Sequence, residues 1–392
     1  MTRSLNILTL SHLYPSAAYP GLGPFVRDEV LELAKRHRIQ VISPLRVPFR
    51  RPALARRVFA VPRHSIEDGI PVIRPRILEL PVRGPRPVGW LWALRLDRPL
   101  RLAYREMRAD LVHAHFALPD GFAAARFASR ERVPLVLTVR GSDVLVFARH
   151  AGARRLLVST LAQANAIIAV SEELASGVEQ LGARPERIRV IPGGIPYEAP
   201  LDRRSARRLL GIPEGDTCIL WVGAFVPVKQ PIDLMRALSS IDAGAEGRKV
   251  HAVMIGDGPL WQAVADLVRQ TNLDGAVQLA GRISRRDVWP WLCAADILVN
   301  SSSSEGTPMS VLEALGAGTP VVAYPLPGVR AILEAVDGGT IAAGVRPEDL
   351  AAAIDAELAT TRDRTRLAAV ARRRFDIGRA VEAIEDVYAR LV

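Results

Sequence analysis

The stretch from Ala294 to Gly328 constrains the fold of this 392-residue chain more than any other segment. Two short apolar runs, each typical of a buried parallel strand, lie near its two ends. Between them, Thr307 and Pro308 predict a helix start, with the hydroxyl at the N-cap and the proline in the first turn. Gly318 lies just past the predicted helix end. The stretch therefore predicts a strand–helix–strand unit whose helix begins at the carboxyl end of a strand, where open α/β sheets place their ligands.

Two carboxylates occupy this predicted ligand edge, Glu305 in the loop and Glu313 on the helix. Helical side chains tilt toward the helix N-terminus, so we expect Glu313 to point back toward the loop that carries Glu305. The pattern alone is compatible with the acid–base pair of a hydrolase. Two groups that bind the hydroxyls of a ligand are the other interpretation.

The rest of the chain repeats the alternation of strands and helices. Segment 44–90 is the exception, because its prolines and arginines leave only a short strand at 70–73 as an assignment. The predicted strands lie at 5–10, 39–43, 111–115, 135–139, 166–170, 187–191, 218–222, 250–255 and 277–280. The predicted helices lie at 25–36, 92–107, 122–129, 154–163, 172–181, 232–239, 260–269, 286–294, 349–373 and 378–391. This order predicts doubly wound parallel sheets.

Chain length and one segment rich in Pro and Gly predict two domains. A chain of 392 residues exceeds what one core usually holds, and segment 192–200 has no periodicity. We expect an N-terminal Rossmann-like domain over 1–195 and a C-terminal one over 196–375, with a last helix at 376–392 that packs back on the first domain. The predicted fold class is α/β, with two tandem Rossmann-like domains facing across a cleft.

The net charge of +11 is carried by the first half of the chain. Residues 1–200 hold 30 Lys and Arg against 17 Asp and Glu, whereas residues 201–392 hold 22 against 24. A basic domain beside a neutral one favours an anionic partner, such as a phospholipid surface, a phosphorylated acceptor or nucleic acid. An arginine-rich composition that affects only the solvated surface explains the same numbers equally well.

Cysteine use and hydropathy give an expected compartment. Cys218 and Cys293 stand in apolar surroundings, which predicts buried free thiols in a reducing environment. No apolar run reaches the roughly 18 residues that cross a bilayer. The chain also runs from Arg3 directly into a predicted strand rather than a signal peptide. We therefore expect a cytoplasmic protein.

Three further strand ends of the C-terminal domain carry residues compatible with a ligand. Lys229 follows the strand at 218–222 and can reach a phosphate as a point charge, although a lone lysine is more often a solvated surface group. The tight turn at 256–259 and Gly281 follow the next two strands, where glycine lets the backbone approach a ligand. Agreement among all these strand ends indicates a ligand site more strongly than any one of them.

The N-terminal domain offers weaker candidates. Gly21–Gly23 can present backbone N–H groups to an anion, but the full G-x-G-x-x-G pattern is absent and a flexible turn explains the glycines as well. We expect His113 and His115, at alternate positions of one strand, to point to opposite faces, with His115 at the rim of the cleft. A lone histidine is usually a satisfied core or surface group. Segment 140–143 follows the next predicted strand, at 135–139, so we expect it at a strand end as well.

Nearly the whole chain resembles the GT-B glycosyltransferases of family 4, which are retaining and metal-independent. The most specific likeness is the motif of Glu305 and Glu313, followed by Ala-Leu-Gly-Ala-Gly-Thr-Pro-Val-Val. Supporting likenesses are the turn at 256–259, Ala-Ala-Asp at 294–296, Ile-Pro-Gly-Gly at 191–194 and Asp-Leu-Val-His-Ala-His at 110–115.

The resemblance implies that these residues bind a nucleotide-sugar. Glu313 is expected to bind the ribose hydroxyls, Glu305 the donor sugar, and Lys229 the departing pyrophosphate. His115 is expected to meet the reactive side of the sugar, so His115, Lys229 and Glu305 are the expected catalytic residues. The expected donor-binding residues are Gly23, Lys229, Gly281, Arg282, Ile283, Glu305, Gly306, Thr307, Pro308, Met309 and Glu313. Arg140 and Asp143 are expected on the acceptor side.

The resemblance also implies front-face substitution, in which the leaving phosphate takes the acceptor proton and neither glutamate is a nucleophile. No Asp-x-Asp motif is present, and neither a metal nor another cofactor is expected. Three positions depart from the family pattern. Ala224 stands where many relatives have a phosphate-binding arginine, Arg140 where many have histidine, and Gly193 where asparagine is usual.

The function predicted from this resemblance is transfer of a sugar from a UDP- or GDP-linked donor to a saccharide or lipid-linked acceptor, in polysaccharide or glycolipid synthesis. Arginines beside Phe49, Trp90 and Trp92 suit peripheral contact with the inner face of an anionic membrane, unless the tryptophans pack inward. One alternative is a soluble disaccharide or glycoside synthase of the same fold; an epimerase or an inactive homologue of that fold are others. A nucleic-acid-binding protein is a further alternative, for which no helix-turn-helix, RRM or zinc pattern is present.

Overall fold

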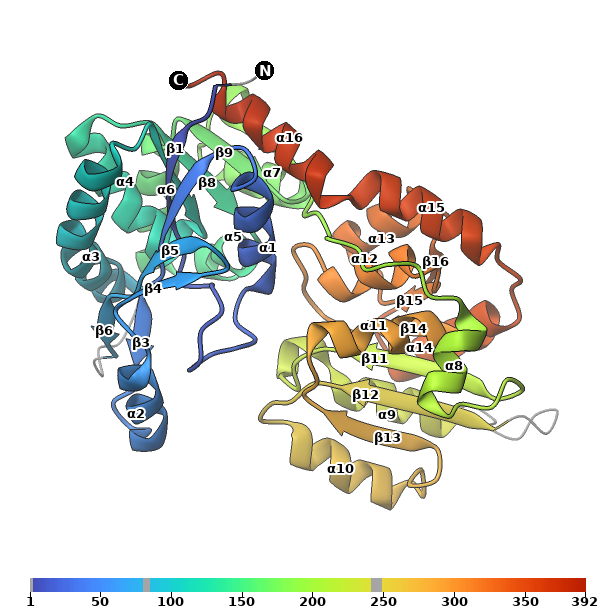
Figure 1. Ribbon diagram of the computed structural model, residues 1–392. Helices are drawn as coiled ribbons and strands as arrows, with labels where there is room; N and C mark the ends of the chain where they lie inside the picture. Colours follow the sequence, from blue (N-terminus) through green and yellow to red (C-terminus); the bar gives the residue numbers. More distant parts are fainter. Residues whose placement is uncertain (1–2, 80–84, 241–248) are drawn as a thin grey trace. The chain divides into compact units, whose positions relative to one another are not determined.

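The computed structural model describes residues 3–79, 85–240 and 249–392 and divides the chain into two compact units. Unit 1 comprises Met1–Gly194 together with Ile377–Val392, and unit 2 comprises Ile195–Asp376. Each unit is an α/β layer structure with its own sheet and its own cores (Figure 1). Parallel sheets therefore organise both halves of the chain, as the sequence predicted.

Unit 1 contains an eight-stranded sheet in the order β10-β9-β8-β7-β1-β2-β5-β4. Its neighbours run parallel except β4, which pairs antiparallel with β5 at the edge. The strands are β1 (Asn6–Leu10), β2 (Arg38–Ile42), β4 (His64–Glu67), β5 (Ile70–Ile73), β7 (Leu111–His115), β8 (Leu135–Val139), β9 (Ala166–Ala169) and β10 (Ile188–Val190). Every residue of β7 and β8 is buried, as expected for central strands covered on both faces.

Helices cover the two faces of this sheet, and the alternation of side chains along β1 divides its core in two (Figure 1). Leu8 and Leu10 pack with α3, α4 and α6, whereas Ile7 packs with α1 and α16 on the opposite face. The helices of unit 1 are α1 (Pro24–Leu33), α2 (Pro52–Ala60), α3 (Pro85–Met107), α4 (Phe122–Glu131), α5 (Ser142–Leu145), α6 (Ala151–Gln163), α7 (Glu172–Gln180) and α16 (Ile377–Tyr388). Short helical turns η1 (Ala117–Gly121), η2 (Phe147–Arg149) and η3 (Pro185–Arg187) connect them.

The end of the chain belongs to unit 1, because α16 packs against α1. Val381 and Tyr388 lie in the same core cluster as Val26 of α1. Glu385 adds polar contacts, accepting from Arg36 Nη1 at 2.6 Å and lying 3.0 Å from His37 Nε2.

Residues 44–79, which the sequence left largely unassigned, form short strands and one helix. β5 confirms the strand predicted at 70–73, and β4 precedes it as the edge strand. A separate two-stranded sheet pairs β3 (Leu45–Val47) with β6 (Arg76–Leu78), and α2 packs on β3. Residues 80–84 of the Pro- and Arg-rich segment 44–90 lie outside the described residues.

Unit 2 contains six parallel strands in the order β13-β12-β11-β14-β15-β16. They are β11 (Thr217–Val222), β12 (Val250–Ile255), β13 (Val277–Gly281), β14 (Ile297–Asn300), β15 (Val321–Ala323) and β16 (Gly339–Ile341). One face packs with α8 (Arg203–Leu210), α11 (Arg285–Ala294), α12 (Met309–Gly316), α13 (Pro327–Glu334) and α15 (Arg364–Phe375). The other face packs with α9 (Pro231–Ser240), α10 (Trp261–Gln270) and α14 (Pro347–Leu358), and η4 (Pro227–Lys229) lies in the loop after β11.

Two predicted helices of unit 2 differ in their bounds. The helix expected at 349–373 is two helices, α14 and α15, and the second starts anew at Asp363, whose side chain caps it by accepting from Arg366 N at 2.9 Å. The helix expected to start at Thr307 begins at Met309, with Pro308 at the N-cap and no side-chain cap there. Gly318 follows its end with a φ of +79°, as the pattern predicted.

Among the described residues, no helix is both long and apolar enough to cross a membrane. Cys218 and Cys293 are free and buried, which confirms the prediction of buried thiols. Burial raises the pKa of Cys218 to about 12 and that of Cys293 to about 11, so both thiols stay protonated.

Candidate active site

The carboxyl ends of β11 and β14, neighbours in the sheet of unit 2, bring Lys229 and Glu305 into contact. The Lys229 ammonium lies 2.5 Å from Oε1 of Glu305, and Ser302 donates to the same oxygen at 2.7 Å. The Lys229 side chain is 29% exposed and that of Glu305 10%. Hydrogen bonds from Ser303 N to Val228 O and from Ser301 Oγ to the Lys229 carbonyl fix the two loops together. A shielded cation and a carboxylate are therefore held side by side at the ligand edge.

The N-terminus of α12 lies next along the same loop, and Gly306 and Thr307 lead into it. An uncapped helix N-terminus attracts negative charge through its backbone N–H groups. Glu313, on the second turn of α12, accepts a hydrogen bond from Arg285 Nε at 2.8 Å and is 14% exposed. Each of the two motif carboxylates thus has its own basic partner.

Glycines let the loops after β11, β12 and β13 approach one another. Gly256 has a φ of +142°, and a Cβ there would lie 1.8 Å from the carbonyl oxygen of Gly223. Its N–H donates to the Gly281 carbonyl at 2.8 Å. Arg282, next to Gly281, lies 3.9 Å from the carboxylate of Asp257. It therefore forms an ion pair with the turn at 256–259. Ile283 is half-buried and packs on the core beneath.

In unit 1, Gly23 is the N-cap of α1 and has a φ of +68°. A Cβ at this position would lie 2.4 Å from the carbonyl oxygen of Leu13, in the loop after β1. Both the backbone conformation and the close approach therefore require glycine. The N-terminus of α1 is held at the carboxyl end of β1 as a result.

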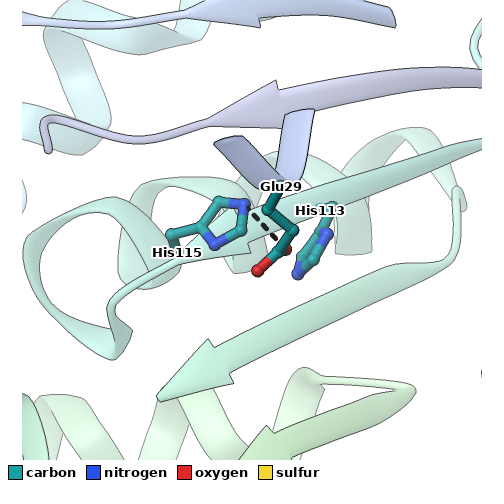
Figure 2. Close-up of side chains that lie close together, drawn as sticks. All are labelled: Glu29, His113 and His115. Atoms are coloured by element: carbon teal, nitrogen blue, oxygen red, sulfur yellow. Dashed lines mark ion pairs between the residues drawn. The ribbon is translucent and has the colours of Figure 1, made fainter. Parts of the chain in front are cut away.

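His113 and His115 lie on the same face of β7, and the expectation of opposite faces was wrong. Residues two apart in a strand share a face, and here the ring centroids are 4.3 Å apart. Figure 2 shows both rings beside Glu29 of α1. His115 is 1% exposed rather than at an open rim. The pair belongs to the α1 and α16 side of the sheet.

Arg140 connects His115 with Glu29. Its Nη2 lies 2.7 Å from Oε2 of Glu29 and donates to Nδ1 of His115 at 3.0 Å. A guanidinium is only a donor, so Nδ1 accepts and the proton of the neutral ring sits on Nε2, 3.9 Å from Oε1 of Glu29. Burial, His113 and Arg140 hold the pKa of His115 well below its usual range. His115 is therefore neutral, with a fixed tautomer.

Glu29, His113 and His115 place one ligand atom each within 4.8 Å of one another, a spacing that suits a metal ion (Figure 2). The donors do not fit one. Nδ1 of His113 lies 2.7 Å from the Tyr388 hydroxyl and its Nε2 lies 2.7 Å from Thr138 Oγ1, so both nitrogens are used. The Arg140 guanidinium already supplies the positive charge beside Glu29. This cluster is a buried hydrogen-bond network.

Asp143, the second residue expected on the acceptor side, is fully buried. Its carboxylate accepts from the backbone N–H groups of Ala117 at 2.8 Å, Gly141 at 2.9 Å and Arg140 at 3.2 Å. Burial raises its pKa despite these bonds. Asp143 thus ties together the loops that follow β7 and β8.

Two functional candidates were missed by reasoning from the sequence. Arg285 holds Glu313, and His12 pairs with Asp120 at the carboxyl ends of β1 and β7. The order of strands in a sheet brings these residues together, and 108 residues separate His12 from Asp120. The strand-end position of both residues was the one available signal.

Comparison with known proteins finds a matching family for each unit. The family "Glycosyl transferases group 1" matches residues 202–374, and "Glycosyltransferase Family 4" matches residues 19–199. TuaC of Bacillus subtilis (strain 168), named for teichuronic acid biosynthesis, is 30% identical over 342 residues, which are 84% of this chain and 83% of TuaC. The chain belongs to glycosyltransferase family 4.

Two further comparisons agree with the assignment of this chain to the glycosyltransferases. The D-inositol 3-phosphate glycosyltransferase of Kineococcus radiotolerans is 31% identical over 330 residues, covering 78% of this chain and 69% of that protein. The crystal structure of Anabaena HepE in complex with UDP and glucose shares the fold, with a TM-score of 0.73, 20% identity and coverage of 99% and 100%. The fold is the GT-B fold, as expected from the resemblance.

Proposed function

We propose that this glycosyltransferase moves a hexose from a UDP- or GDP-linked donor to a saccharide or lipid-linked acceptor, with retention and without a metal ion. Its membership of family 4 makes it an enzyme of glycan synthesis. The proposal of a nucleotide-sugar donor rests on the ion pair between Lys229 and Glu305 beside the N-terminus of α12. HepE was crystallised with UDP-glucose, which supports a UDP-linked donor for a related fold.

The proposed chemistry follows from where charge develops. Breaking the bond between the sugar and the diphosphate places negative charge on the leaving group. Lys229 and the N-terminus of α12 offset this charge, and Glu305 and Glu313 accept hydrogen bonds from hydroxyls of the sugar and the ribose. Gly281, Arg282 and Ile283 contribute backbone groups for the base, and Gly23 contributes backbone N–H groups for a phosphate. We assign no sugar contact to His115, because it is buried and its Nε2 faces Glu29.

Acceptor-free hydrolysis tests this proposal. The protein is incubated with UDP-glucose, UDP-N-acetylglucosamine or GDP-mannose in the presence of EDTA, and released nucleoside diphosphate is measured. Slow release from at least one donor supports the proposal. Absence of release from all three, with none of them raising the melting temperature, contradicts it.

A soluble glycoside synthase is a second candidate, favoured by the 31% identity to the D-inositol 3-phosphate glycosyltransferase. Surface composition favours a lipid-linked acceptor instead. Leu94 and Leu102 of α3 are 75% and 56% exposed, and Arg95 and Arg98 beside them are exposed as well. Trp92, expected at this surface, is instead buried, whereas Trp90 is half exposed.

We extend the proposal to an anionic membrane as a partner of α3. Exposed leucines between arginines are the composition of helices that lie on anionic bilayers. Flotation with phosphatidylglycerol vesicles and with phosphatidylcholine vesicles tests this. Binding to the anionic vesicles that Leu94→Ser weakens supports the contact, and equal binding to both kinds of vesicle contradicts it.

A further inference from the structure

A groove lies in unit 1 between α3 and the edge strands β4 and β5. Its volume is about 990 Å³, which is at the upper end of the range of about 300–1,000 Å³ for small-molecule sites. All of its lining residues belong to unit 1, and none of them is a residue that the proposed function assigns to the donor. The groove is therefore a separate candidate binding site.

The two ends of α3 lie at opposite edges of the unit 1 sheet, which gives the groove a direction. Near the start of α3, the Trp92 ring lies 5.6 Å from the ring of His12, which follows the carboxyl end of β1. Just after the end of α3, the backbone N–H of Asp110 donates at 2.8 Å to the carbonyl of Asn6, the first residue of β1. The first half of α3 thus lines the groove toward the carboxyl edge of the sheet, and the second half toward the amino edge.

Three exposed arginines gather at the carboxyl-edge end of the groove. Arg95 and Arg98 lie on the first half of α3. Arg63 precedes β4, and its carbonyl accepts at 2.8 Å from the N–H of Arg74, which follows the carboxyl end of β5. Arg74 lines the groove too, but it is buried and lies 2.7 Å from the Glu67 carboxylate, which neutralises it. The described residues supply no carboxylate to pair with any of the three exposed arginines, so this end carries uncompensated positive charge.

The other end of the groove exposes large apolar side chains. Leu102 is 56% exposed and lies two turns beyond Arg95, roughly 10 Å along α3. Ile66 of β4 is 77% exposed and pairs with Pro71 near the amino end of β5. Glu106, one turn further along α3, is the one carboxylate among the described lining residues and repels an anion from this end. The groove therefore has a cationic end and an apolar end, and an apolar ligand gains by covering the exposed side chains.

We propose that this groove binds one lipid phosphate. The phosphate lies among Arg63, Arg95 and Arg98, whose guanidinium groups suit its oxygens. The alkyl chain lies over Leu102 and Ile66. A nucleic acid or an acidic peptide would require positive charge along its whole length, whereas here the charge is confined to one end.

The direction of the groove suits a lipid that carries the sugar acceptor. Its cationic end lies at the carboxyl edge of the unit 1 sheet, the edge where open α/β sheets bind ligands. A saccharide attached to the bound phosphate therefore starts at that edge. The assignment of this lipid as the carrier of the acceptor rests on the proposed function, but the binding of a lipid phosphate does not.

Titration calorimetry with decyl phosphate, kept below its micelle concentration, tests the site. We expect one molecule to bind per chain. Inorganic phosphate and decyl maltoside should each bind at least about tenfold more weakly, because the first lacks the alkyl chain and the second lacks the charge. Arg98→Ser and Leu102→Ser should each weaken binding of decyl phosphate by about tenfold or more, for the same two reasons.

Arg105→Ser and Leu94→Ser are matched controls, because both residues are exposed on α3 and neither lines the groove. Both variants should bind decyl phosphate as the wild type does. Leu94→Ser also separates the groove from the proposed contact of α3 with a bilayer, since that change should weaken flotation and leave this binding intact.

Equal affinity of the groove variants and the controls overturns the site. Equal affinity for decyl maltoside overturns the role of the arginines, and equal affinity for inorganic phosphate overturns the role of the apolar end. No donor takes part in these titrations, so the site and the proposed function can fail separately. If decyl phosphate binds as expected but no nucleotide-sugar is hydrolysed, the lipid phosphate site stands and its role in holding an acceptor falls.

Discussion

Lys229 and Glu305 form a 2.5 Å ion pair although 76 residues separate them in the chain. The pairing follows from sheet order, because β11 and β14 are adjacent parallel strands whose carboxyl ends meet. Each group satisfies the charge of the other. In the proposed function, a nucleotide-sugar exchanges this contact for two others, the lysine with the diphosphate and the glutamate with a hydroxyl.

Replacement of Lys229 by methionine should lower kcat for donor hydrolysis by about 10²–10³-fold. The change removes the cation that offsets charge on the leaving group and leaves Glu305 without its counter-ion. Steady-state release of nucleoside diphosphate measures the effect. Lys229→Arg is the control and should retain more activity, since the charge remains. An unchanged kcat in the methionine variant contradicts the role of Lys229.

Replacement of Glu313 by alanine should weaken binding of the nucleotide. Hydrogen bonds to a charged group contribute about 1.5–3 kcal/mol, which corresponds to roughly 10- to 150-fold in Kd. Titration calorimetry with the nucleoside diphosphate measures it. Glu348→Ala, at the start of α14, is a control that should bind as wild type does. Equal affinity of both variants argues against contact between Glu313 and the ribose.

The strand and helix pattern was predictable because the buried strands of both sheets are continuous apolar runs. The strand–helix–strand unit at the paired glutamates was found for this reason, including Gly318 just past the helix end. Helix bounds were less accurate where a new N-cap interrupts a periodic stretch, as Asp363 does between α14 and α15. Residues 360–366 are all polar, so the sequence does mark this break, and the prediction of one continuous helix passed over it.

Contacts between distant strands could not be predicted from the sequence. Lys229 and Glu305 were each assigned to a ligand, but their mutual pairing depends on which strands are neighbours. The pair of His12 and Asp120 was missed for the same reason. For His113 and His115 the information was present, since residues two apart share a strand face, and the expectation misapplied it.

Stability of unit 1 should fall in acid because of His113. Burial lowers its folded-state pKa to about 3, from 6.5 in the unfolded chain. The unfolded chain therefore binds a proton first as the pH falls below 6.5, and stability decreases until about pH 3. The slope is about 1.4 kcal/mol per pH unit, or about 2 kcal/mol between pH 6.5 and pH 5. Urea unfolding at pH 7 and pH 5 measures this loss.

In the His113→Asn variant, the free energy of unfolding should fall less between pH 7 and pH 5 than in the wild type, whatever its value at pH 7. His64, exposed at the edge strand β4, provides the control, and His64→Asn should keep the wild-type difference. An identical pH dependence in the His113 variant contradicts a buried neutral histidine.

Gly256→Ala should destabilise unit 2. The added Cβ would lie 1.8 Å from the Gly223 carbonyl oxygen, and the φ of +142° disfavours any side chain. A backbone atom cannot move aside as a flexible side chain can, so a fall of several degrees in melting temperature is expected. Gly275→Ala, where a Cβ would meet no atom within 4 Å, is the matched control.

Sugar transfer should proceed with retention and without a covalent intermediate. Glu305 is bound to Lys229 and Glu313 to Arg285, and a carboxylate held by a cation is a weak nucleophile. The first sugar released by hydrolysis of an α-linked donor should therefore be the α anomer, which proton NMR can follow before mutarotation. Intact-mass spectrometry with a 2-fluoro donor should show no glycosyl adduct. A β product contradicts retention, whereas an adduct on either glutamate keeps retention and assigns it to double displacement.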